Sequence, residues 1–171
     1  MNATHLLRTE RLDLRPCGID DLEALHGLWC EGEVRRFLFD DRCISRDEAR
    51  SFVEASVESF ANHSFGLWLF RERHGDPIAG FAGLLGALQE PPRLIFGTRP
   101  QLWGRGYATE AAAAVLRYAM GTLGLTRVLA DVDEPNTASG RVLEKLGMSR
   151  TSRALVNGRP ILYYEIARAA R

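Results

Sequence analysis

The sequence predicts a mixed α/β fold, because segments with helical spacing of apolar residues alternate with short strand-like runs. Two segments show clear helical periodicity, 49–60 and 107–123. A hairpin signal, Asn157-Gly158, separates two further runs near the end of the chain. The length of 171 residues suits one core, and no linker or repeat interrupts the order of elements. We therefore expect a single domain spanning residues 1–171.

Strand-like runs rich in β-branched and aromatic residues are bounded by turn residues. The expected strands are residues 6–15, 65–72, 78–85, 93–99, 127–132, 148–156 and 160–168. Turns are expected at residues 73–77 and 89–92, which contain Gly, Pro or Asp. The strand–helix–strand unit 93–132 should contain a parallel pair joined by a right-handed crossover.

Two helices are expected in the first half of the chain. Asp20 and Glu23 have the spacing of a capping box at the start of the first. Ser45 and Glu48 have the same spacing before the second, which includes the periodic segment 49–60. The intervening residues 31–44 are irregular.

Two more helices are expected in the second half. A long helix should run over residues 107–123, with apolar residues on one side. Asn136 should cap a shorter helix that ends at Gly147, a typical position for a helix-terminating glycine. Together these elements form a β-α-β-α unit followed by a hairpin.

The charge and hydropathy patterns exclude several functional classes. Lys plus Arg equals Asp plus Glu, 22 each, so the basic excess typical of a nucleic-acid-binding protein is absent. No run approaches the roughly 20 apolar residues needed to cross a bilayer. The first residues lack the apolar stretch of a secretory signal. We expect a cytoplasmic protein that binds neither nucleic acid nor membrane.

Cysteine and histidine spacing gives no sign of a metal site. The cysteines are odd in number and lack C-x-x-C spacing: Cys17, Cys30 and Cys43. We expect three reduced thiols, partly packed in the core. The histidines lie in unrelated segments without ligand spacing: His5, His26, His63 and His74. We therefore predict no metal.

The most informative segment leads from the strand 93–99 into the long helix. Gly104 and Gly106 let the backbone approach a ligand closely, and the first turn of a helix offers unpaired N–H groups to an anion. A plain strand-to-helix turn would also explain the glycines. A dinucleotide fingerprint fits poorly, because Thr109 replaces its third glycine and Arg127 stands near where an acidic residue is needed.

Three blocks of sequence resemble the GNAT superfamily of N-acetyltransferases. Gln101-x-x-Gly104-x-Gly106 fits its Q/R-x-x-G-x-G/A signature, and residues 103–111 are similar to the RimJ/RimL-type branch, which acetylates the N-termini of ribosomal proteins. Residues 136–148 and 9–12 supply the other two blocks. The resemblance implies a GNAT-type fold with a central, mostly antiparallel twisted sheet of about seven strands and helices on both faces.

The resemblance also implies acetyl-CoA as co-substrate and a set of contact residues. The loop 101–109 would hold the pyrophosphate, and main-chain groups of residues 96–98 would run beside the pantetheine. Asn136 would contact the pantetheine arm, and Ser139 would lie by the sulfur and protonate the departing thiolate. The implied coenzyme contacts are Phe96, Gly97, Thr98, Gln101, Trp103, Gly104, Arg105, Gly106, Tyr107, Ala108, Thr109, Asn136 and Ser139, the last two also being catalytic candidates.

Two departures from the family pattern concern proton transfer. Leu143 stands where many members carry a tyrosine acid, and Arg93 stands where related sequences often have a glutamate. The candidate bases that remain are Asp131, Asp133 and Glu165, although a carboxylate in such a position is more often a plain surface or hairpin charge. The alternative for Ser139 is that it has no catalytic role and is a solvated serine in the first turn of its helix.

The sequence thus predicts direct acetyl transfer to a primary amine, by a monomer or a homodimer. The acceptor is either a protein N-terminus or a small molecule, and the lack of an obvious base favours an α-amine over a lysine. A catalytically silent acyl-CoA-binding module is the alternative. Three aromatic residues near the irregular segment either form the acceptor wall or pack in the core: Trp29, Phe37 and Phe39.

Overall fold

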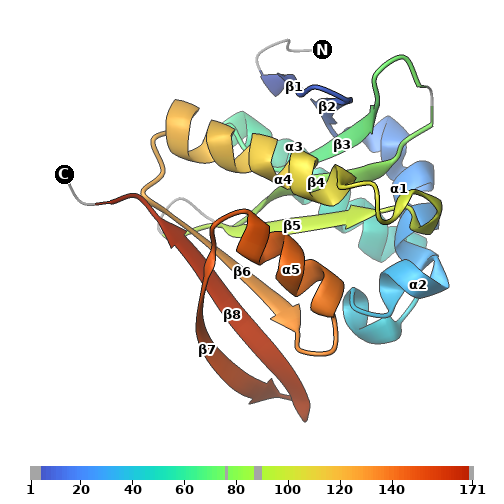
Figure 1. Cartoon of the computed structure of the whole chain (residues 1–171). Coiled ribbons are helices and arrows are strands. Elements are labelled where there is room, and N and C mark those ends of the chain that lie inside the picture. Colours follow the sequence, from blue (N-terminus) through green and yellow to red (C-terminus); the bar gives the residue numbers. More distant parts are fainter. Residues whose placement is uncertain (1–4, 76, 87–89, 170–171) are drawn as a thin grey trace.

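The computed structural model describes residues 5–75, 77–86 and 90–169, and these residues contain one sheet of eight strands (Figure 1). The strand order is β1-β2-β3-β4-β5-β6-β8-β7. The strands are β1 (Leu7–Arg8), β2 (Leu12–Pro16), β3 (Leu67–Glu72), β4 (Gly80–Leu85), β5 (Arg93–Thr98), β6 (Arg127–Asp133), β7 (Ser149–Val156) and β8 (Arg159–Ala167). β5 and β6 pair in parallel, and the other neighbours pair antiparallel. The predicted mixed, mostly antiparallel sheet is confirmed.

Helices cover both faces of the sheet, as predicted (Figure 1). The helices are α1 (Leu22–Cys30), α2 (Gly32–Arg35), α3 (Arg46–His63), α4 (Tyr107–Arg117) and α5 (Thr137–Lys145). Short turns of other helix types are η2 (Ile19–Asp21), η3 (Phe39–Asp41), η4 (Pro100–Leu102) and η5 (Tyr118–Thr122). α4 and α5 lie on one face, called here the α4 face, and α1 and α3 lie on the other, the α1 face. None of the helices in the described residues is long and apolar enough to span a membrane.

The alternation of side chains along β3 explains why two cores form. Trp68 and Phe70 belong to the apolar cluster that includes α4, whereas Leu67 and Leu69 pack with Leu25 of α1. All five side chains are at most 4% exposed. Because successive side chains of a strand point to opposite faces, the central strand is apolar on both sides and is covered on both.

One capping prediction is confirmed and the other is wrong. The Ser45 hydroxyl accepts a hydrogen bond from the Glu48 amide at 3.1 Å, and the Glu48 carboxylate accepts one from the Ser45 amide at 2.8 Å, as in a capping box. Asp20 does not cap α1, which begins at Leu22. Instead Asp21 accepts the Gly18 amide at 2.8 Å and closes the short turn before the helix.

Two other elements differ from their expected lengths. The expected strand 6–15 is divided into β1 and β2, because the Thr9 amide bonds the Leu12 carbonyl at 2.9 Å and closes a turn between them. The expected helix 107–123 becomes a π-helical turn from Tyr118, where the Leu123 amide bonds the Tyr118 carbonyl, five residues back. The Tyr118 hydroxyl also donates to the Ser64 carbonyl at 2.8 Å, which ties this turn to the end of α3.

The last two predicted features of the second half are confirmed. Asn157 and Gly158 both have positive φ, 51° and 76°, as a two-residue hairpin turn between β7 and β8 requires. Gly147 follows α5 with φ 80°, a left-handed conformation that glycine adopts without strain. Parts of the expected turns, Asp76 and Gln89, lie outside the described residues, as do residues 1–4.

Candidate active site

The loop between β5 and α4 has a backbone that depends on two glycines. Gly104 and Gly106 have φ values of 76° and 79°, in the left-handed region where a side chain is strained. The Trp103 indole N–H donates to the Thr98 carbonyl at 2.8 Å and fixes the loop to the end of β5. The Trp103 ring itself is 52% exposed and lies beside the loop rather than in the core. The glycines therefore serve a specific backbone path.

This path leaves a row of backbone amides without partners. Within the described residues, the amides of Gly104 through Thr109 donate to neither a backbone carbonyl nor a side chain, and the first amide of α4 with a partner is that of Glu110, bonded to the Gly106 carbonyl at 3.0 Å. Unpaired amides at a helix N-terminus carry partial positive charge. The loop is therefore suited to bind an anion with several oxygen atoms, such as a pyrophosphate.

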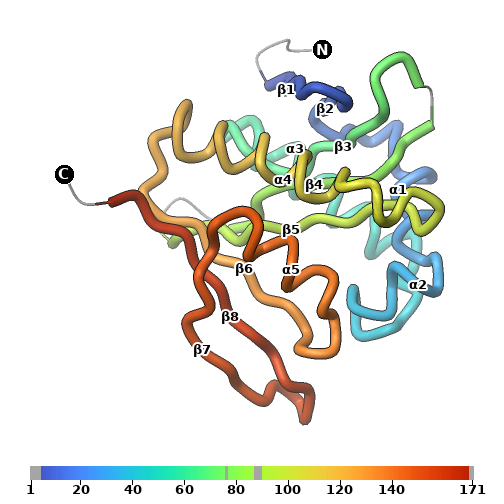
Figure 2. The backbone as a smooth tube through the Cα atoms, viewed as in Figure 1, coloured from blue at the N-terminus to red at the C-terminus, as the bar shows by residue number. Residues whose placement is uncertain are grey.

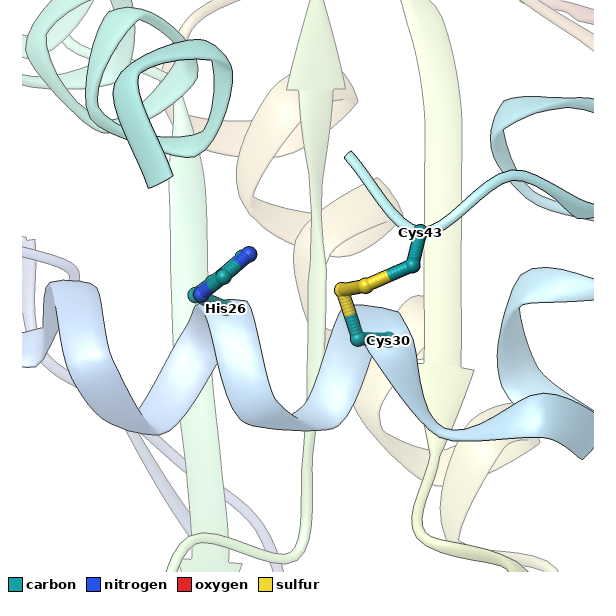
Figure 3. Close-up of side chains that lie close together, drawn as sticks. All are labelled: His26, Cys30 and Cys43. Carbon is teal, nitrogen blue, oxygen red and sulfur yellow. A yellow bond between two sulfur atoms is a disulfide. The ribbon is translucent and has the colours of Figure 1, made fainter. Parts of the chain in front are cut away.

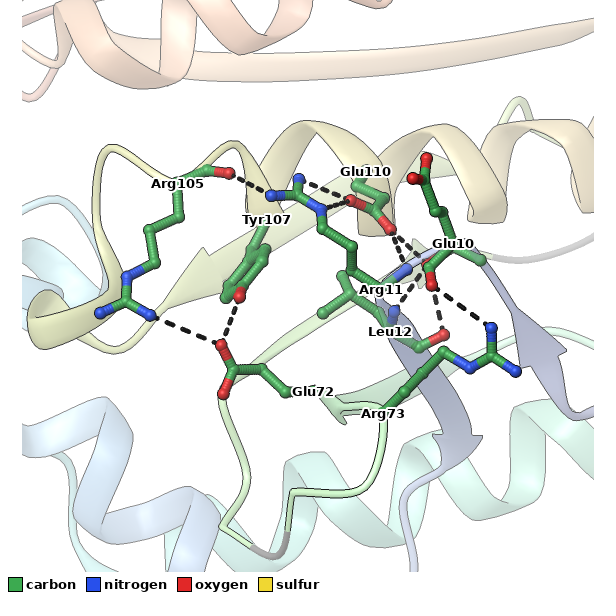
Figure 4. A network of polar contacts seen from close by, with 9 residues as sticks. Glu10, Arg11, Leu12, Glu72, Arg73, Arg105, Tyr107 and Glu110 are labelled. Carbon is green, nitrogen blue, oxygen red and sulfur yellow. Dashed lines mark hydrogen bonds and ion pairs between the residues drawn. The ribbon is translucent and has the colours of Figure 1, made fainter.

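The first strands of the chain hold this loop and helix in place (Figure 4). Glu110, in the first turn of α4, accepts hydrogen bonds from the Thr9 hydroxyl at 2.6 Å, the Arg11 amide at 2.9 Å and Arg11 Nε at 2.6 Å. Arg11 Nη1 also donates to the Arg105 carbonyl at 2.8 Å, inside the loop. The block 9–12 and the block 103–111, far apart in sequence, are thus two halves of one contact.

Tyr107 anchors the loop from its other side. Its ring is buried, with the Arg11 guanidinium 4.7 Å from the ring centre, and its hydroxyl donates a hydrogen bond to Glu72 at the end of β3. The Arg105 guanidinium lies 3.6 Å from the same Glu72 carboxylate (Figure 4). Glu72 therefore contacts two side chains of the loop, Arg105 and Tyr107.

Glu110 is ionised in this network. Burial opposes its ionisation, but hydrogen bonds from Thr9 and Arg11 together outweigh that cost and lower the pKa of its carboxyl below the ordinary value. An ionised acid in the first turn also suits the positive end of the helix. The charge that fixes the loop is therefore present at neutral pH.

β5 and β6 separate beyond a single paired position. Arg93 pairs with Leu129, and within the described residues the remainder of β5, from Leu94 to Thr98, has no partner in β6. Figure 2 shows the two strands diverging from this point. Phe96, Gly97 and Thr98 therefore pair with β4 alone, and the Thr98 carbonyl accepts the Trp103 indole N–H in place of a β6 partner. An extended ligand could occupy the opening between β5 and β6.

A cleft of about 300 Å³ lies between the diverging strands and connects the two faces of the sheet. On the α4 face it is lined by Phe96 and Ala130 and by residues of α5. On the α1 face it is lined by Ile95 and the irregular segment that includes α2. The full lining comprises Phe37, Leu38, Leu85, Arg93, Leu94, Ile95, Phe96, Ala130, Asp131, Val132, Asp133, Asn136, Ser139, Leu143 and Ile161.

Asn136 and Ser139 lie together at the α4-face side of the cleft. The Asn136 side-chain oxygen accepts the Ser139 amide at 3.3 Å, so the predicted N-cap is confirmed. Leu143, one turn further along α5, is fully buried and also lines the cleft. Leu143 therefore presents an apolar side chain where many family members present a tyrosine hydroxyl. Ser139 is the hydroxyl-bearing residue of α5 that lines the cleft.

The carboxylates at the cleft are on its α1-face side. Asp131 and Arg93 pair at 2.8 Å across the separating strands, and Asp133 pairs with Arg159 of β8 at 2.9 Å. Glu165 does not line the cleft: it pairs with Arg127, and hydrogen bonding to that guanidinium lowers its pKa. Of the three candidate bases, only the two aspartates are placed to reach a reacting group.

The aromatic residues near the irregular segment divide into two groups. Phe37 lines the cleft with Leu38. Trp29 and Phe39 instead pack edge to face, with ring centres 5.8 Å apart, and Trp29 is 3% exposed in the core below α1. Of the three aromatic residues considered from the sequence, only Phe37 therefore contributes to the wall.

The expectation of three reduced thiols is wrong. Cys30, the last residue of α1, and Cys43 form a disulfide, and only Cys17 is free among the described cysteines. Cys17 is buried, and burial raises the pKa of its thiol to about 11, which keeps it protonated. None of the cysteines lines the cleft. Spacing along the chain missed the disulfide because the fold, not a local motif, brings residues 30 and 43 together.

The predicted site residues thus come together in two adjoining places. The segment 101–109 forms the loop with unpaired amides, with the Gln101 side chain exposed at its start and Ala108 and Thr109 in the first turn of α4. Phe96, Asn136 and Ser139 line the cleft itself. The sequence did not reveal that Arg93 and Asp131 pair, because they lie on different strands, 38 residues apart.

This arrangement belongs to a known class. The family model for the acetyltransferase (GNAT) domain matches residues 11–149, so the chain is a member of the GNAT family and an N-acetyltransferase by class. The family uses acetyl-CoA. The resemblance seen in the sequence is confirmed.

Individual relatives agree with this assignment. The chain is 29% identical over 147 residues to the uncharacterized N-acetyltransferase YoaA of Bacillus subtilis, covering 85% of this chain and 83% of that protein. It is also 29% identical to the FsC-acetyl coenzyme A-N(2)-transacetylase of Aspergillus fumigatus, covering 87% and 67%. The structure of RimL, a ribosomal L7/L12 alpha-N-protein acetyltransferase in complex with coenzyme A, superposes with a TM-score of 0.81 over 95% of this chain and 97% of that one. At 15% identity, that likeness concerns the fold.

Proposed function

We propose that the protein binds acetyl-CoA through the loop 101–109 and transfers the acetyl group directly to a primary amine. The row of unpaired amides from Gly104 to Thr109, at the end of a strand next to the cleft, carries this proposal. The pyrophosphate would lie on these amides, and the pantetheine would follow β5 toward Asn136. The thioester would then reach the cleft from the α4 face.

The two sides of the cleft suggest how the reaction partners are arranged. Ser139 and Asn136 approach from the α4 face, and Asp131 and Asp133 approach from the α1 face. The acceptor amine would enter from the α1 face and attack the thioester carbonyl carbon. The C–S bond then breaks, the amine loses a proton, and the thiolate of coenzyme A gains one. We propose that the amine attacks acetyl-CoA directly, without a covalent enzyme intermediate, and no described cysteine lines the cleft to form a thioester with the acetyl group.

We propose that the acceptor is an amine of low pKa. An unperturbed lysine, with a pKa near 10.4, costs roughly 4.6 kcal/mol to deprotonate at neutral pH, whereas an α-amine costs only about 1–1.4 kcal/mol. Both carboxylates at the cleft are already paired with an arginine, Asp131 with Arg93 and Asp133 with Arg159. A protein N-terminus or a small α-amine therefore suits this site.

Release of coenzyme A tests the proposal. Turnover is measured with acetyl-CoA against peptides that carry either a free α-amine or a single lysine, and against polyamines, amino acids and aminoglycosides. We expect release with at least one α-amine acceptor, and faster turnover on the α-amine peptide than on its lysine counterpart at neutral pH. A preference for lysine would mean that the site contains a stronger base than either aspartate.

A catalytically silent acyl-CoA-binding module is the second candidate. Leu143 in place of the family tyrosine and Arg93 in place of a glutamate favour it. It predicts tight binding of acetyl-CoA and no release with any acceptor in the panel. A cytoplasmic location, a single domain over residues 1–171 and a monomeric or homodimeric state accompany either candidate as predictions.

A further inference from the structure

A histidine and two cysteines converge on the α1 face, outside the cleft (Figure 3). His26 and Cys30 lie four residues apart on α1, so they share one side of the helix. Cys43 reaches them from the end of the irregular segment. One ring nitrogen of His26 and the two sulfur atoms all lie within 4.8 Å of one another. The acetyl-transfer proposal gives these three side chains no role.

The two sulfurs form a disulfide, and a reductant converts them into ligands. Two molecules of a small thiol, R–SH, reduce the Cys30–Cys43 bond: two cysteine thiols form, and the small molecules leave as R–S–S–R. Each cysteine thiol can then lose its proton to become a thiolate, the form that binds metals. The oxidised pair offers no thiolate, so the disulfide and a metal–thiolate site exclude each other.

We propose that the reduced protein binds one zinc ion through His26, Cys30 and Cys43. Two thiolates and one imidazole are a ligand set typical of zinc, with bond lengths of about 2.3 Å to sulfur and about 2.0–2.1 Å to nitrogen. Cys43 is exposed, so water could reach the ion and supply the fourth ligand. Thiolate and imidazole also disfavour magnesium and calcium, which prefer oxygen.

The backbone next to Cys43 supports this geometry. The Ile44 carbonyl lies 2.7 Å from His26 Nε2, and Ile44 is itself 2% exposed, so the peptide that follows the cysteine also orients the imidazole. Coordination through Nδ1 would keep this hydrogen bond, as is common for zinc-binding histidines. Coordination through Nε2 would replace it with the metal bond.

The site would have a structural consequence for the cleft wall. The disulfide closes the segment between Cys30 and Cys43, which contains the cleft residues Phe37 and Leu38. Within it, Phe39, Asp40 and Asp41 all have positive φ, between 55° and 60°, which is unfavourable for residues other than glycine. Zinc would link the same two ends in the reduced protein and so maintain this backbone without the disulfide.

Zinc titration of the full chain in two redox states tests the proposal without relying on catalysis. Metal-free protein is reduced with tris(2-carboxyethyl)phosphine, and a second sample is left oxidised. Zinc is then added in competition with a chromophoric chelator. We expect one zinc ion per reduced chain and none per oxidised chain. The comparison uses unmutated protein, so no defect introduced by a substitution can produce the difference.

Single substitutions identify the ligands. His26→Ala and Cys43→Ser should each weaken zinc binding by about tenfold or more, since even loss of a group that only supports a ligand costs 10–100-fold. Cys17→Ala and His74→Ala are the matched controls, because Cys17 is buried away from the cluster and His74 is exposed in the turn after β3. Both should bind zinc as the unmutated protein does.

The outcomes decide the proposal. Cobalt, used in place of zinc, should give the thiolate charge-transfer absorption of a sulfur-ligated tetrahedral site. The proposal is overturned if the reduced chain binds no more zinc than the oxidised chain. It is equally overturned if His26→Ala leaves the affinity unchanged, because the histidine is then not a ligand.

Discussion

The two faces of the sheet are built in different ways. On the α4 face, the loop before α4 is fixed by local backbone conformation and by one charged residue, Glu110, which bonds Thr9 and Arg11. On the α1 face, the cleft wall is an irregular segment closed by a disulfide and tied to the final hairpin by an ion pair between Asp40 and Arg159, which also pairs with Asp133 of β6. The α4 face thus presents a continuous loop whose backbone is specified locally and held from outside by Arg11, whereas the α1 face presents an irregular segment closed by a disulfide.

Because of this difference, the α4 face should govern the binding of acetyl-CoA and the α1 face should govern which acceptor is used. The α4 face presents backbone amides, which recognise an anion whatever the neighbouring side chains are. The α1 face presents side chains such as Phe37 and Leu38, whose substitution changes the shape of the cleft without touching those amides. We therefore expect changes on the α4 face to affect acetyl-CoA, and changes on the α1 face to affect the acceptor.

Gly106→Val should have the largest effect. At φ 79°, a β-branched residue is strongly disfavoured, so the loop must change its path and the amides lose their common direction. We expect acetyl-CoA to give no measurable rise in melting temperature for this variant. Gly27→Ala on α1, an exposed helical glycine with no atom near its added methyl group, is the control and should keep the full rise. Normal acetyl-CoA binding by Gly106→Val would show that the anion lies elsewhere.

Ser139→Ala should lower turnover by about tenfold to a hundredfold, the lower end of general-acid effects. A thiol has a pKa near 8.5, so protonation of the leaving thiolate at neutral pH is favourable by about 2 kcal/mol without help. Steady-state kinetics, with acetyl-CoA affinity measured separately, give the comparison, and the exposed Ser149→Ala is the control. A loss of a thousandfold with unchanged binding would make Ser139 an essential acid.

Asn136→Ala should instead weaken coenzyme binding and lose a helix cap worth about 1 kcal/mol.

Phe37→Ala should raise the acceptor KM by about threefold to tenfold, as expected for losing part of an apolar contact worth about 1 kcal/mol. Acetyl-CoA affinity should stay within about twofold, because Phe37 lies on the α1 face. Val57→Ala, which shortens an exposed apolar side chain of α3 outside the cleft, is the control and should leave both constants unchanged. If Phe37→Ala weakened acetyl-CoA as much as the acceptor, the two faces would not act separately.

Glu110→Gln should lower the free energy of unfolding at pH 7 by about 1–2 kcal/mol, through weaker hydrogen bonds to Thr9 and Arg11. The pKa of Glu110 is lower in the folded chain than its ordinary value near 4.3, so its stabilisation is complete above that pH and is lost as pH falls through the folded pKa. Denaturant unfolding from pH 7 to pH 3 should therefore show the variant and the unmutated protein converging. Glu54→Gln, in an exposed pair with Arg50, should change stability by less than about 0.5 kcal/mol. A constant difference at all pH values would contradict the assigned ionisation.

The parts of the fold that were predictable depend on local signals. The Ser45–Glu48 cap, the Asn157-Gly158 turn and the glycine-containing loop are each specified within a few residues. Asp20 does not cap α1; the next residue, Asp21, instead accepts the Gly18 amide and closes a turn before the helix. Equally good local signals can therefore compete, and spacing alone does not choose between them.

The parts that were not predictable depend on distant contacts. The Cys30–Cys43 disulfide, the Arg93–Asp131 pair and the bonds from Arg11 to Glu110 join residues between 13 and 99 positions apart. Nothing in the composition indicates such partners. The loop and two cleft carboxylates, Asp131 and Asp133, could be located from sequence, but the partners of these groups required the fold.

The central claim, that the amides from Gly104 to Thr109 bind the pyrophosphate of acetyl-CoA, is tested most directly by thermal unfolding with different ligands. Acetyl-CoA at about 100 times its dissociation constant should add about 2.7 kcal/mol, which for a chain of this size raises the melting temperature by about 5–10 °C. Coenzyme A should act similarly, and S-acetyl-pantetheine, which lacks the pyrophosphate, should act far more weakly at the same concentration. A rise with NAD or ATP, and none with acetyl-CoA or coenzyme A, would contradict the account.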